Sequence, residues 1–231
     1  MKRIVFLFLL FLNSIIWAQQ DSLFVVEPDD KYVEDQFYFG INYNLLVSAP
    51  DNASQSSFSY GIMGGFIKDI PINKRRNIGF GVGVGLSFNA IYSDLLATQA
   101  ENGSISYQIV PDDISYNRNN LTMNFVEFPI EFRWRSSKAD DYRFWRIYSG
   151  IKLSYLISGN SKFVADTETI KFSNKDIRDM QYGVYFSFGY NTWNFYAQYD
   201  LSNIFEDNTY TIDGDLMDTQ IFKAGLIFYI L

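Results

Sequence analysis

Charged side chains of both signs recur in one strongly apolar stretch, residues 121–135, where they alternate with Phe, Ile and Trp. Alternate side chains of an extended strand point to opposite faces, so these charges share a face. Unpaired charges are costly away from water, and the mixed signs therefore predict a network of ion pairs across neighbouring strands. A gated ion path or a paired-carboxylate site is the alternative chemistry. The charges are Glu127, Glu131, Arg133 and Arg135, with Arg146 and Lys152 from the next apolar stretch. Pro129, which lacks a ladder donor, predicts a β-bulge.

A second charged set is acidic and lies near the C-terminus. Carboxylate oxygens are the ligands that calcium prefers, but the ordered spacing of a calcium loop is missing, so we interpret the set as a solvated outer loop and expect no metal. The glycines of GFGVGVG, residues 79–85, are not followed by the Lys-Ser/Thr of a phosphate-binding loop,. We therefore expect no nucleotide and no other cofactor. The acidic residues are Glu206, Asp207, Asp213, Asp215 and Asp218.

The composition removes several kinds of chemistry. The 231 residues include no Cys and no His, so disulfides, thiol catalysis and hydrolytic triads based on histidine have no residues to be built from. The formal charge of −7 disfavours nucleic acid, whose phosphates require a basic surface. We expect a protein that is not an enzyme.

The elements that position these residues are strands, because apolar residues recur with a period of two rather than 3.6. Each run has about ten residues or more, the length that a tilted strand needs to cross a hydrocarbon layer. The runs are 36–47, 57–68, 77–91, 121–135, 144–157, 181–191, 192–202 and 220–231. They predict an all-β fold, an eight-stranded antiparallel up-and-down transmembrane β-barrel over 36–231, monomeric and surrounded by outer-membrane lipid.

Period two does not say which face is inside, so a soluble lipocalin-like barrel is the competing interpretation. In residues 78–89 one face is apolar and the other is largely glycine, which suits a narrow lumen. Connections alternate between short (69–76, 136–143, 190–193) and long (48–56, 92–120, 158–180, 203–219), the pattern of outer-membrane barrels,. Aromatic residues near strand ends resemble an interfacial girdle: Tyr43, Tyr92, Trp134, Trp145, Tyr155, Tyr190, Trp193 and Tyr229.

The two ends of the chain carry targeting features. Residues 1–18 have a basic start and an apolar run, which predicts a cleaved secretory signal peptide,, and residues 19–35 form a polar periplasmic lead-in. In the final strand, Lys223, Gly225, Phe228 and Ile230 have the spacing of a barrel-insertion signal. These features indicate delivery to the outer membrane.

The stretch 126–130, VEFPI, resembles a characteristic strand of the PorT-like family of small outer-membrane barrels from Bacteroidota. The closing GLIFYIL and the strand that begins at Trp193 are also similar to that family. The resemblance implies an integral outer-membrane protein, with a founding member linked to type IX protein secretion and gliding.

Taken together, these features favour a structural or accessory barrel with a side-chain-filled lumen, which assists secretion or another envelope assembly through contacts with its proteins. A passive small-solute porin is the first alternative, and a soluble lipocalin-like ligand carrier is the second.

Overall fold

The computed structural model describes residues 35–50, 53–111, 113–136, 144–166 and 168–230. The expected signal peptide and residues 19–34 of the lead-in lie outside this part of the chain. Within it, no helix has the length and apolar character needed to cross a membrane.

Eleven strands make up the regular structure of the described residues. They are β1 (Gln36–Val47), β2 (Tyr60–Pro71), β3 (Ile78–Tyr92), β4 (Leu95–Gln99), β5 (Ile105–Ile109), β6 (Tyr116–Arg135), β7 (Trp145–Ala165), β8 (Thr169–Ser173), β9 (Met180–Tyr190), β10 (Trp193–Asp200) and β11 (Gln220–Ile230).

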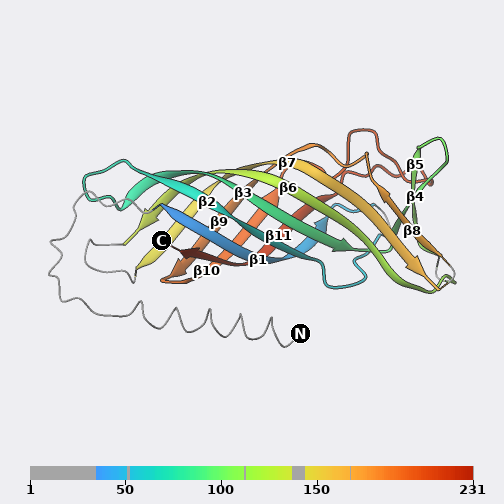
Figure 1. Cartoon of the computed structure of the whole chain (residues 1–231), viewed down its shortest axis with the longest axis horizontal. Coiled ribbons are helices and arrows are strands. Elements are labelled where there is room, and N and C mark those ends of the chain that lie inside the picture. The colour runs from blue at the N-terminus through green and yellow to red at the C-terminus, as the bar shows by residue number, and fades with distance from the viewer. Residues whose placement is uncertain (1–34, 51–52, 112, 137–143, 167, 231) are drawn as a thin grey trace, which may run out of the picture. The chain divides into compact units, whose positions relative to one another are not determined.

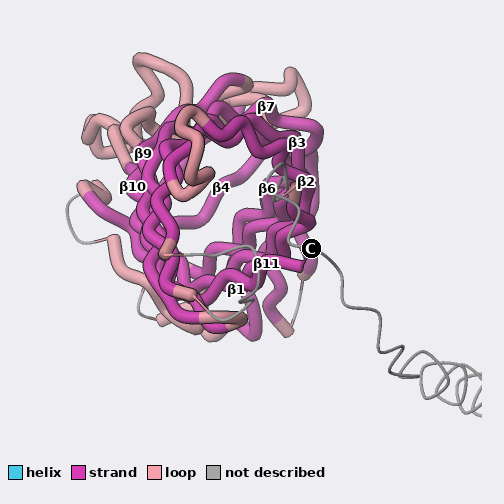
Figure 2. Tube along the Cα trace, turned by 90° about the vertical axis from the view of Figure 1, so that its left-hand side faces the viewer, coloured by secondary structure: helices cyan, strands magenta, loops and turns pink. Residues whose placement is uncertain are grey.

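Eight of these strands close into an antiparallel barrel, which confirms the predicted fold class. The order β6-β3-β2-β1-β11-β10-β9-β7 returns to its start through an additional β6–β7 pairing. Figure 2 shows the closed ring from the end that carries the short turns. The long connections gather at the other end, on the right in Figure 1, where β4 and β5 form a separate hairpin and β8 pairs with the end of β7.

Two strands are longer than the hydrophobic pattern predicted. β6 begins at Tyr116 rather than Leu121, and β7 continues to Ala165 rather than ending at Ile157. Their extra residues pair with each other, for example Asn119 with Phe163. The extension carries polar residues on both faces, so it has no apolar alternation to reveal it.

The prediction of a bulge at Pro129 is wrong. The β6–β7 register is constant across this residue, and it shifts instead between Asn124 and Phe125. On the β3 side, Gly83 leaves room for the ring, since a Cβ at Gly83 would lie 3.1 Å from Pro129 Cγ. The apolar residues Met123 and Phe125 do not mark a change of face: they point inward and are buried.

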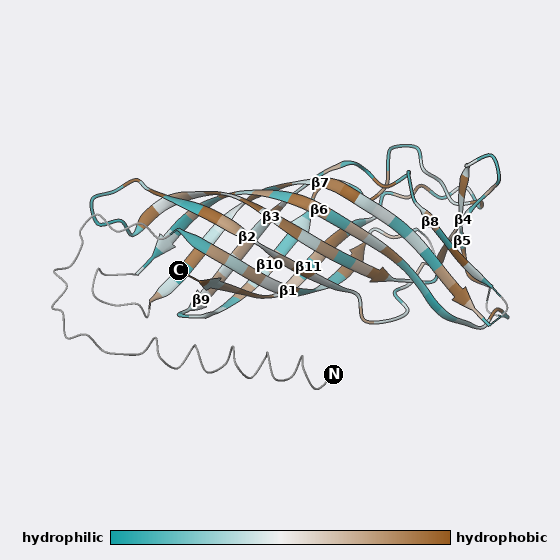
Figure 3. Ribbon diagram, in the orientation of Figure 1, coloured by the Kyte–Doolittle hydropathy of each residue, from teal (hydrophilic) through white to brown (hydrophobic). Residues whose placement is uncertain are grey.

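The apolar face of every barrel strand turns outward, the reverse of a lipocalin-like arrangement. Phe80, Val82, Val84 and Leu86 of β3 are exposed, while Gly79, Gly81 and Gly85 between them are buried. Figure 3 shows the hydrophobic residues as bands along the barrel strands. Such an exterior matches the hydrocarbon of a membrane. Of the expected girdle, Trp145, Tyr155, Tyr190 and Trp193 lie on this exterior.

Tyr229 is the exception in that girdle, because it points into the barrel and is buried. It lies beside Tyr148 with ring centroids 5.3 Å apart. The alternation of β11 places Phe228 and Ile230 outward, so Tyr229 between them must face inward,.

Candidate functional site in the barrel interior

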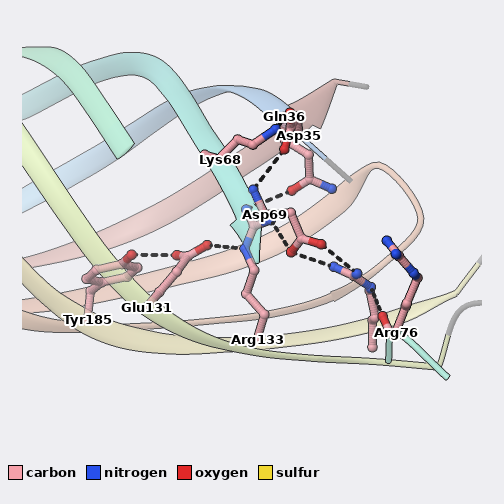
Figure 4. A network of polar contacts seen from close by, with 9 residues as sticks. Asp35, Gln36, Lys68, Asp69, Arg76, Glu131, Arg133 and Tyr185 are labelled. Atoms are coloured by element: carbon pink, nitrogen blue, oxygen red, sulfur yellow. Dashed lines mark hydrogen bonds and ion pairs between the residues drawn. The ribbon is translucent and has the colours of Figure 1, made fainter. Parts of the chain in front are cut away.

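A carboxylate shared by two arginines lies inside the barrel, close to the short-turn end. Asp69, near the end of β2, accepts two hydrogen bonds from Arg135, at 2.9 Å from Nη1 and 2.8 Å from Nη2. Arg133 Nη1 also donates to Asp69, at 3.1 Å. Arg135 Nε donates to the carbonyl oxygen of Arg76 at 2.9 Å, which ties the β2–β3 turn to β6 (Figure 4). The bidentate geometry fixes both side chains as well as neutralising them.

Arg133 extends this network across the barrel. Its Nε donates to Glu131 at 2.7 Å and its Nη2 donates to the side-chain oxygen of Gln36 at 3.1 Å. The Tyr185 hydroxyl of β9 donates to the other oxygen of Glu131 (Figure 4). We call the group formed by Gln36, Asp69, Glu131, Arg133, Arg135 and Tyr185 the Asp69 cluster.

A second network, the Lys152 cluster, lies farther from the short turns. Lys152 forms an ion pair of 3.0 Å with Glu127 and donates to the Tyr196 hydroxyl at 2.8 Å. The Tyr196 hydroxyl donates to the side-chain oxygen of Gln198, and the side-chain amide of Gln198 donates to Asp200. Lys223 is the last member of this network and forms an ion pair of 3.1 Å with Asp200. Its members are Glu127, Lys152, Tyr196, Gln198, Asp200 and Lys223.

Arg146 joins neither cluster among the described residues. It is buried near the β9–β10 turn, where it donates to the carbonyl oxygen of Asn191. Its guanidinium also stacks over the ring of Phe144, 4.2 Å from the centroid. Asn191 has a positive φ of 55°, a conformation that Asn adopts more readily than most residues. The turn therefore aims a carbonyl at the cation.

The glycines of β3 make room for these long side chains. A Cβ at Gly81 would lie 2.8 Å from Arg133 Nε, and one at Gly85 would lie 2.1 Å from the Tyr38 hydroxyl. A glycine face on one strand thus accommodates large polar groups from its neighbours.

An exposed ion pair stands outside the Asp69 cluster at the short-turn end. Asp35 accepts from Lys68 and, at 2.9 Å, from the backbone N–H of Asp69. Partial burial opposes ionisation of Asp35, but these two donors outweigh it and lower its pKa,. Solvent screens this pair,.

The long-loop end of the interior is apolar. We define the apolar plug as a buried cluster contributed by barrel strands, by β4 and β5, and by the loops that precede β9 and β11. It comprises Ile91, Ala97, Tyr107, Met123, Phe125, Ile177, Ile204, Phe205, Met217 and Ile221.

Tyr107 fastens the β4–β5 hairpin to this plug. Its hydroxyl lies 3.0 Å from Asn174 Oδ1 and 3.1 Å from Asp176 Oδ2. Burial raises the pKa of Tyr107, and the charge of Asp176 raises it further, so the hydroxyl keeps its proton as a donor,. The hairpin is therefore held by both a buried ring and a hydrogen bond.

Buried side chains fill the barrel interior in the Asp69 cluster, in the Lys152 cluster and in the apolar plug. Arg133 in the Asp69 cluster is 0% exposed, Glu127 in the Lys152 cluster is 1% exposed, and Met123 in the plug is 0% exposed. A water-filled lumen would leave such groups accessible. The arrangement can hold charges in place, and it leaves them no contact with bulk solvent.

The acidic outer loop, expected from Glu206, Asp207, Asp213, Asp215 and Asp218, lies between β10 and β11 at the long-loop end. Asp207 forms an ion pair with Arg178, and Asp215 closes a turn with Thr211, whose N–H donates to the Asp215 carbonyl at 2.9 Å. Within the described residues, no three acidic side chains converge in a way that would hold a metal ion.

The residues of the expected insertion signal divide between the two faces of β11. Lys223 points inward to Asp200, and Gly225 lies opposite Asn42 on β1. Phe228 contacts Trp193 on the exterior with ring centroids 5.3 Å apart, and Ile230 is exposed. Their role in insertion stays a prediction.

The structure brings five of the six expected lumen charges into the two clusters and adds partners that sequence reasoning missed. The sequence pattern places Asp69 in a short connection, but the structure places it in β2, at the inward position two residues after Ile67. Asp200 follows the inward residues Tyr196 and Gln198 at the same spacing. The two-residue period could have found both carboxylates.

Three solved structures are reported as similar to this chain. Ail, the attachment invasion locus protein of Yersinia pestis, is 13% identical, with a TM-score of 0.39 over 84% of this chain and 96% of Ail. A second Ail structure, in complex with the heparin analogue sucrose octasulfate, is 14% identical with a TM-score of 0.38, over 85% of this chain and 97% of Ail. A porin from Rhodopseudomonas blastica is 7% identical with a TM-score of 0.20, over 86% of this chain and all of the porin. No curated protein matches the chain.

The sequence pattern of the outer membrane protein beta-barrel domain matches residues 17–206. That span covers most of the chain, including all barrel strands before β11. The closed ring, the apolar exterior and this match lead to one conclusion: the chain belongs to the outer membrane protein beta-barrel domain family, whose members lie in the outer membrane.

Proposed function

We propose that this barrel is a structural or accessory component of an envelope assembly, such as a type IX-like protein secretion machinery, and that it acts through surface contacts as a single barrel. The filled interior carries this proposal. Two polar clusters and the apolar plug occupy successive parts of the lumen, with buried side chains in each. If the lumen is filled, the exterior and the loops are the surfaces that can contact other molecules.

The long-loop end offers a surface for such contacts. Tyr210, Ile212 and Leu216 are 50%, 62% and 47% exposed on the loop between β10 and β11. Tyr210 and Leu216 form an antiparallel bridge, so the loop presents these side chains on an ordered turn. Acidic residues, among them Asp213 and Asp215, surround them in the sequence. Exposed apolar groups with a charged rim are typical of protein-binding surfaces.

The same geometry argues against the two alternatives. A passive porin needs a water-filled lumen, which eight strands enclose only narrowly, and here side chains occupy that space. A soluble carrier needs its apolar face inside, and here that face is outside. Catalysis and binding of nucleic acid are not part of the proposal, because the chain lacks His and Cys and carries a net charge of −7.

Planar-bilayer recording tests the closed lumen. We expect purified barrel to give no stable channel steps above the level of a detergent blank at moderate salt. Reproducible large conductance steps would contradict the proposal and favour the porin.

Affinity purification from gently solubilised native membranes tests the accessory role. We expect one or more envelope proteins to co-purify with the wild type, and to be lost from an Ile212→Ser, Leu216→Ser variant. Ile72→Ser is the matched control, since Ile72 is 56% exposed at the short-turn end. Repeated recovery of the barrel alone would contradict the role.

A further inference from the structure

An apolar groove runs over the barrel exterior where β1, β2 and β11 meet. Its volume is about 430 Å³, and its lining includes Ile41, Tyr43, Phe58, Ile62 and Leu226. Ile41 and Ile62 are directly opposed on β1 and β2 and are both exposed. In this family the exterior faces hydrocarbon, so a lipid chain is the natural occupant.

A polar cleft lies at the long-loop end of this groove. It has a volume of about 600 Å³ and is lined by residues that include Ser56, Ser57, Tyr92, Tyr116 and Arg118. Arg118 is exposed and is the charged residue among those that line the cleft in the described chain. Its neighbour Asn117 donates to Asp166 at 3.0 Å, and Asp166 is not among the residues that line the cleft. The cleft therefore favours a negatively charged group.

The groove and the cleft share two lining residues, Phe58 and Tyr60. Phe58 packs beside Tyr43 with centroids 5.0 Å apart, and Tyr60 lies 6.1 Å from Phe88. Tyr60 is the first residue of β2 and Phe58 precedes that strand, a position where aromatic side chains mark the boundary between hydrocarbon and head groups. The apolar groove therefore continues into the cleft that contains Arg118, at the depth where the acyl chain of a lipid meets its phosphate.

We propose that the groove and cleft together bind one anionic phospholipid-like molecule, with an acyl chain against Ile41 and Ile62 and its phosphate at Arg118. The volumes are of the size that specific small-molecule sites have. The proposal uses the exterior and the membrane location alone, so it is independent of whether the barrel has an accessory role.

Native mass spectrometry of the full mature barrel in non-ionic detergent tests the head-group preference. The probes are phosphatidylglycerol and phosphatidylcholine with identical acyl chains. We expect a one-to-one adduct with phosphatidylglycerol at about tenfold lower concentration, the effect of one hydrogen bond to a charged group. Arg118→Ala should abolish the preference, whereas Arg75→Ala, an exposed arginine in the β2–β3 turn, should retain it.

Two further measurements test the groove. Ile62→Trp should fill the groove and weaken binding of both lipids, while Ile130→Trp on the β6 exterior should not. Inorganic phosphate should fail to displace phosphatidylglycerol at equal concentration, because it lacks the acyl chain. Equal binding of the two lipids, a preference that survives Arg118→Ala, or displacement by phosphate alone would overturn the proposal. Heat-dependent gel mobility verifies that each variant is folded.

Discussion

Asp69 neutralises two guanidinium groups at once, whereas Glu131 neutralises one and shares it with Asp69. If Glu131 is lost, Arg133 still donates to the carboxylate of Asp69. Loss of Asp69 removes two hydrogen bonds from Arg135 and one from Arg133 at the same time. The two acidic residues of the Asp69 cluster are therefore unequal, and the one outside the predicted network is the more important.

Asp69→Asn should lower the free energy of unfolding by about 3 kcal/mol, because it removes the negative charge that two buried arginines share,. Glu131→Gln should cost less. Asp35→Asn is the control, since the exposed pair with Lys68 should contribute at most about 1 kcal/mol. Urea unfolding in lipid vesicles measures all three. Equal effects of Asp69→Asn and Asp35→Asn would show that the interior charges are solvated.

Residue types allowed the charged face to be predicted, but its partners were only partly predictable. Glu127, Arg133 and Lys152 alternate with large apolar residues, and that contrast identifies them. Asp69 stands beside Ile70, Pro71 and a turn, where an acidic residue is ordinarily solvated. The end of β2 comes close to β6 because both strands pair with β3, where Gly81 lies between Asp69 and Glu131 and has no side chain.

At the scale of elements, β3 shows how the two faces of one strand are under different constraints. Its inward glycines have no room for a methyl group, whereas an outward glycine on neighbouring β2 has more clearance. A Cβ at Gly64 would lie 3.3 Å from its nearest atom, the carbonyl oxygen of Tyr38. Glycine is thus required for space inside, and its conformational freedom is not the reason.

Gly85→Ala should destabilise the barrel by about 1–3 kcal/mol, because the added methyl overlaps Tyr38 and the backbone of β2,. Gly64→Ala, on the lipid side, should change stability by much less. Both variants are compared by urea unfolding and by the temperature at which gel mobility changes. If Gly64→Ala is the more damaging of the two, the faces of β2 and β3 have been misassigned.

Phe128→Arg tests the outward face of β6. Phe128 is 44% exposed and lies near the middle of the outward residues between Asn124 and Trp134. An arginine near the centre of the bilayer should cost about 2–4 kcal/mol, and Phe132→Arg, closer to the strand end, should cost less. Unfolding in vesicles measures the difference. Tolerance of both substitutions would mean that this face is not in contact with lipid.

The hydrophobic period predicted strands only where one face meets lipid. The bounds of β1 agree with the prediction at both ends. The pattern did not reveal the outer parts of β6 and β7, nor β4, β5 and β8, because these segments lie beyond the apolar exterior and have no lipid-facing side. The β4–β5 hairpin is held in place by contacts between distant parts of the chain, such as Tyr107 with Asn174.

At the scale of the whole molecule, the segregation of short and long connections predicts the orientation in the membrane. The chain contains no Cys, so single cysteines can be introduced without a background. Cysteine in place of Asp213 or Asp215 should react with an impermeant label on intact cells. Cysteine in place of Lys74 should react only after the outer membrane is opened. Equal labelling at both ends would contradict the orientation.

The ladder between β1 and β11 joins the first and last strands of the ring, from Phe37 opposite Ile230 to Val47 opposite Gln220. The ring can therefore close only after β11 has been synthesised and delivered. Until then both strands have unpaired edges, and such edges associate readily with other chains. Each molecule is thus prone to aggregation until the eleven residues of β11 pair with β1. Biogenesis of this barrel must be post-translational, and the waiting chain needs protection from aggregation.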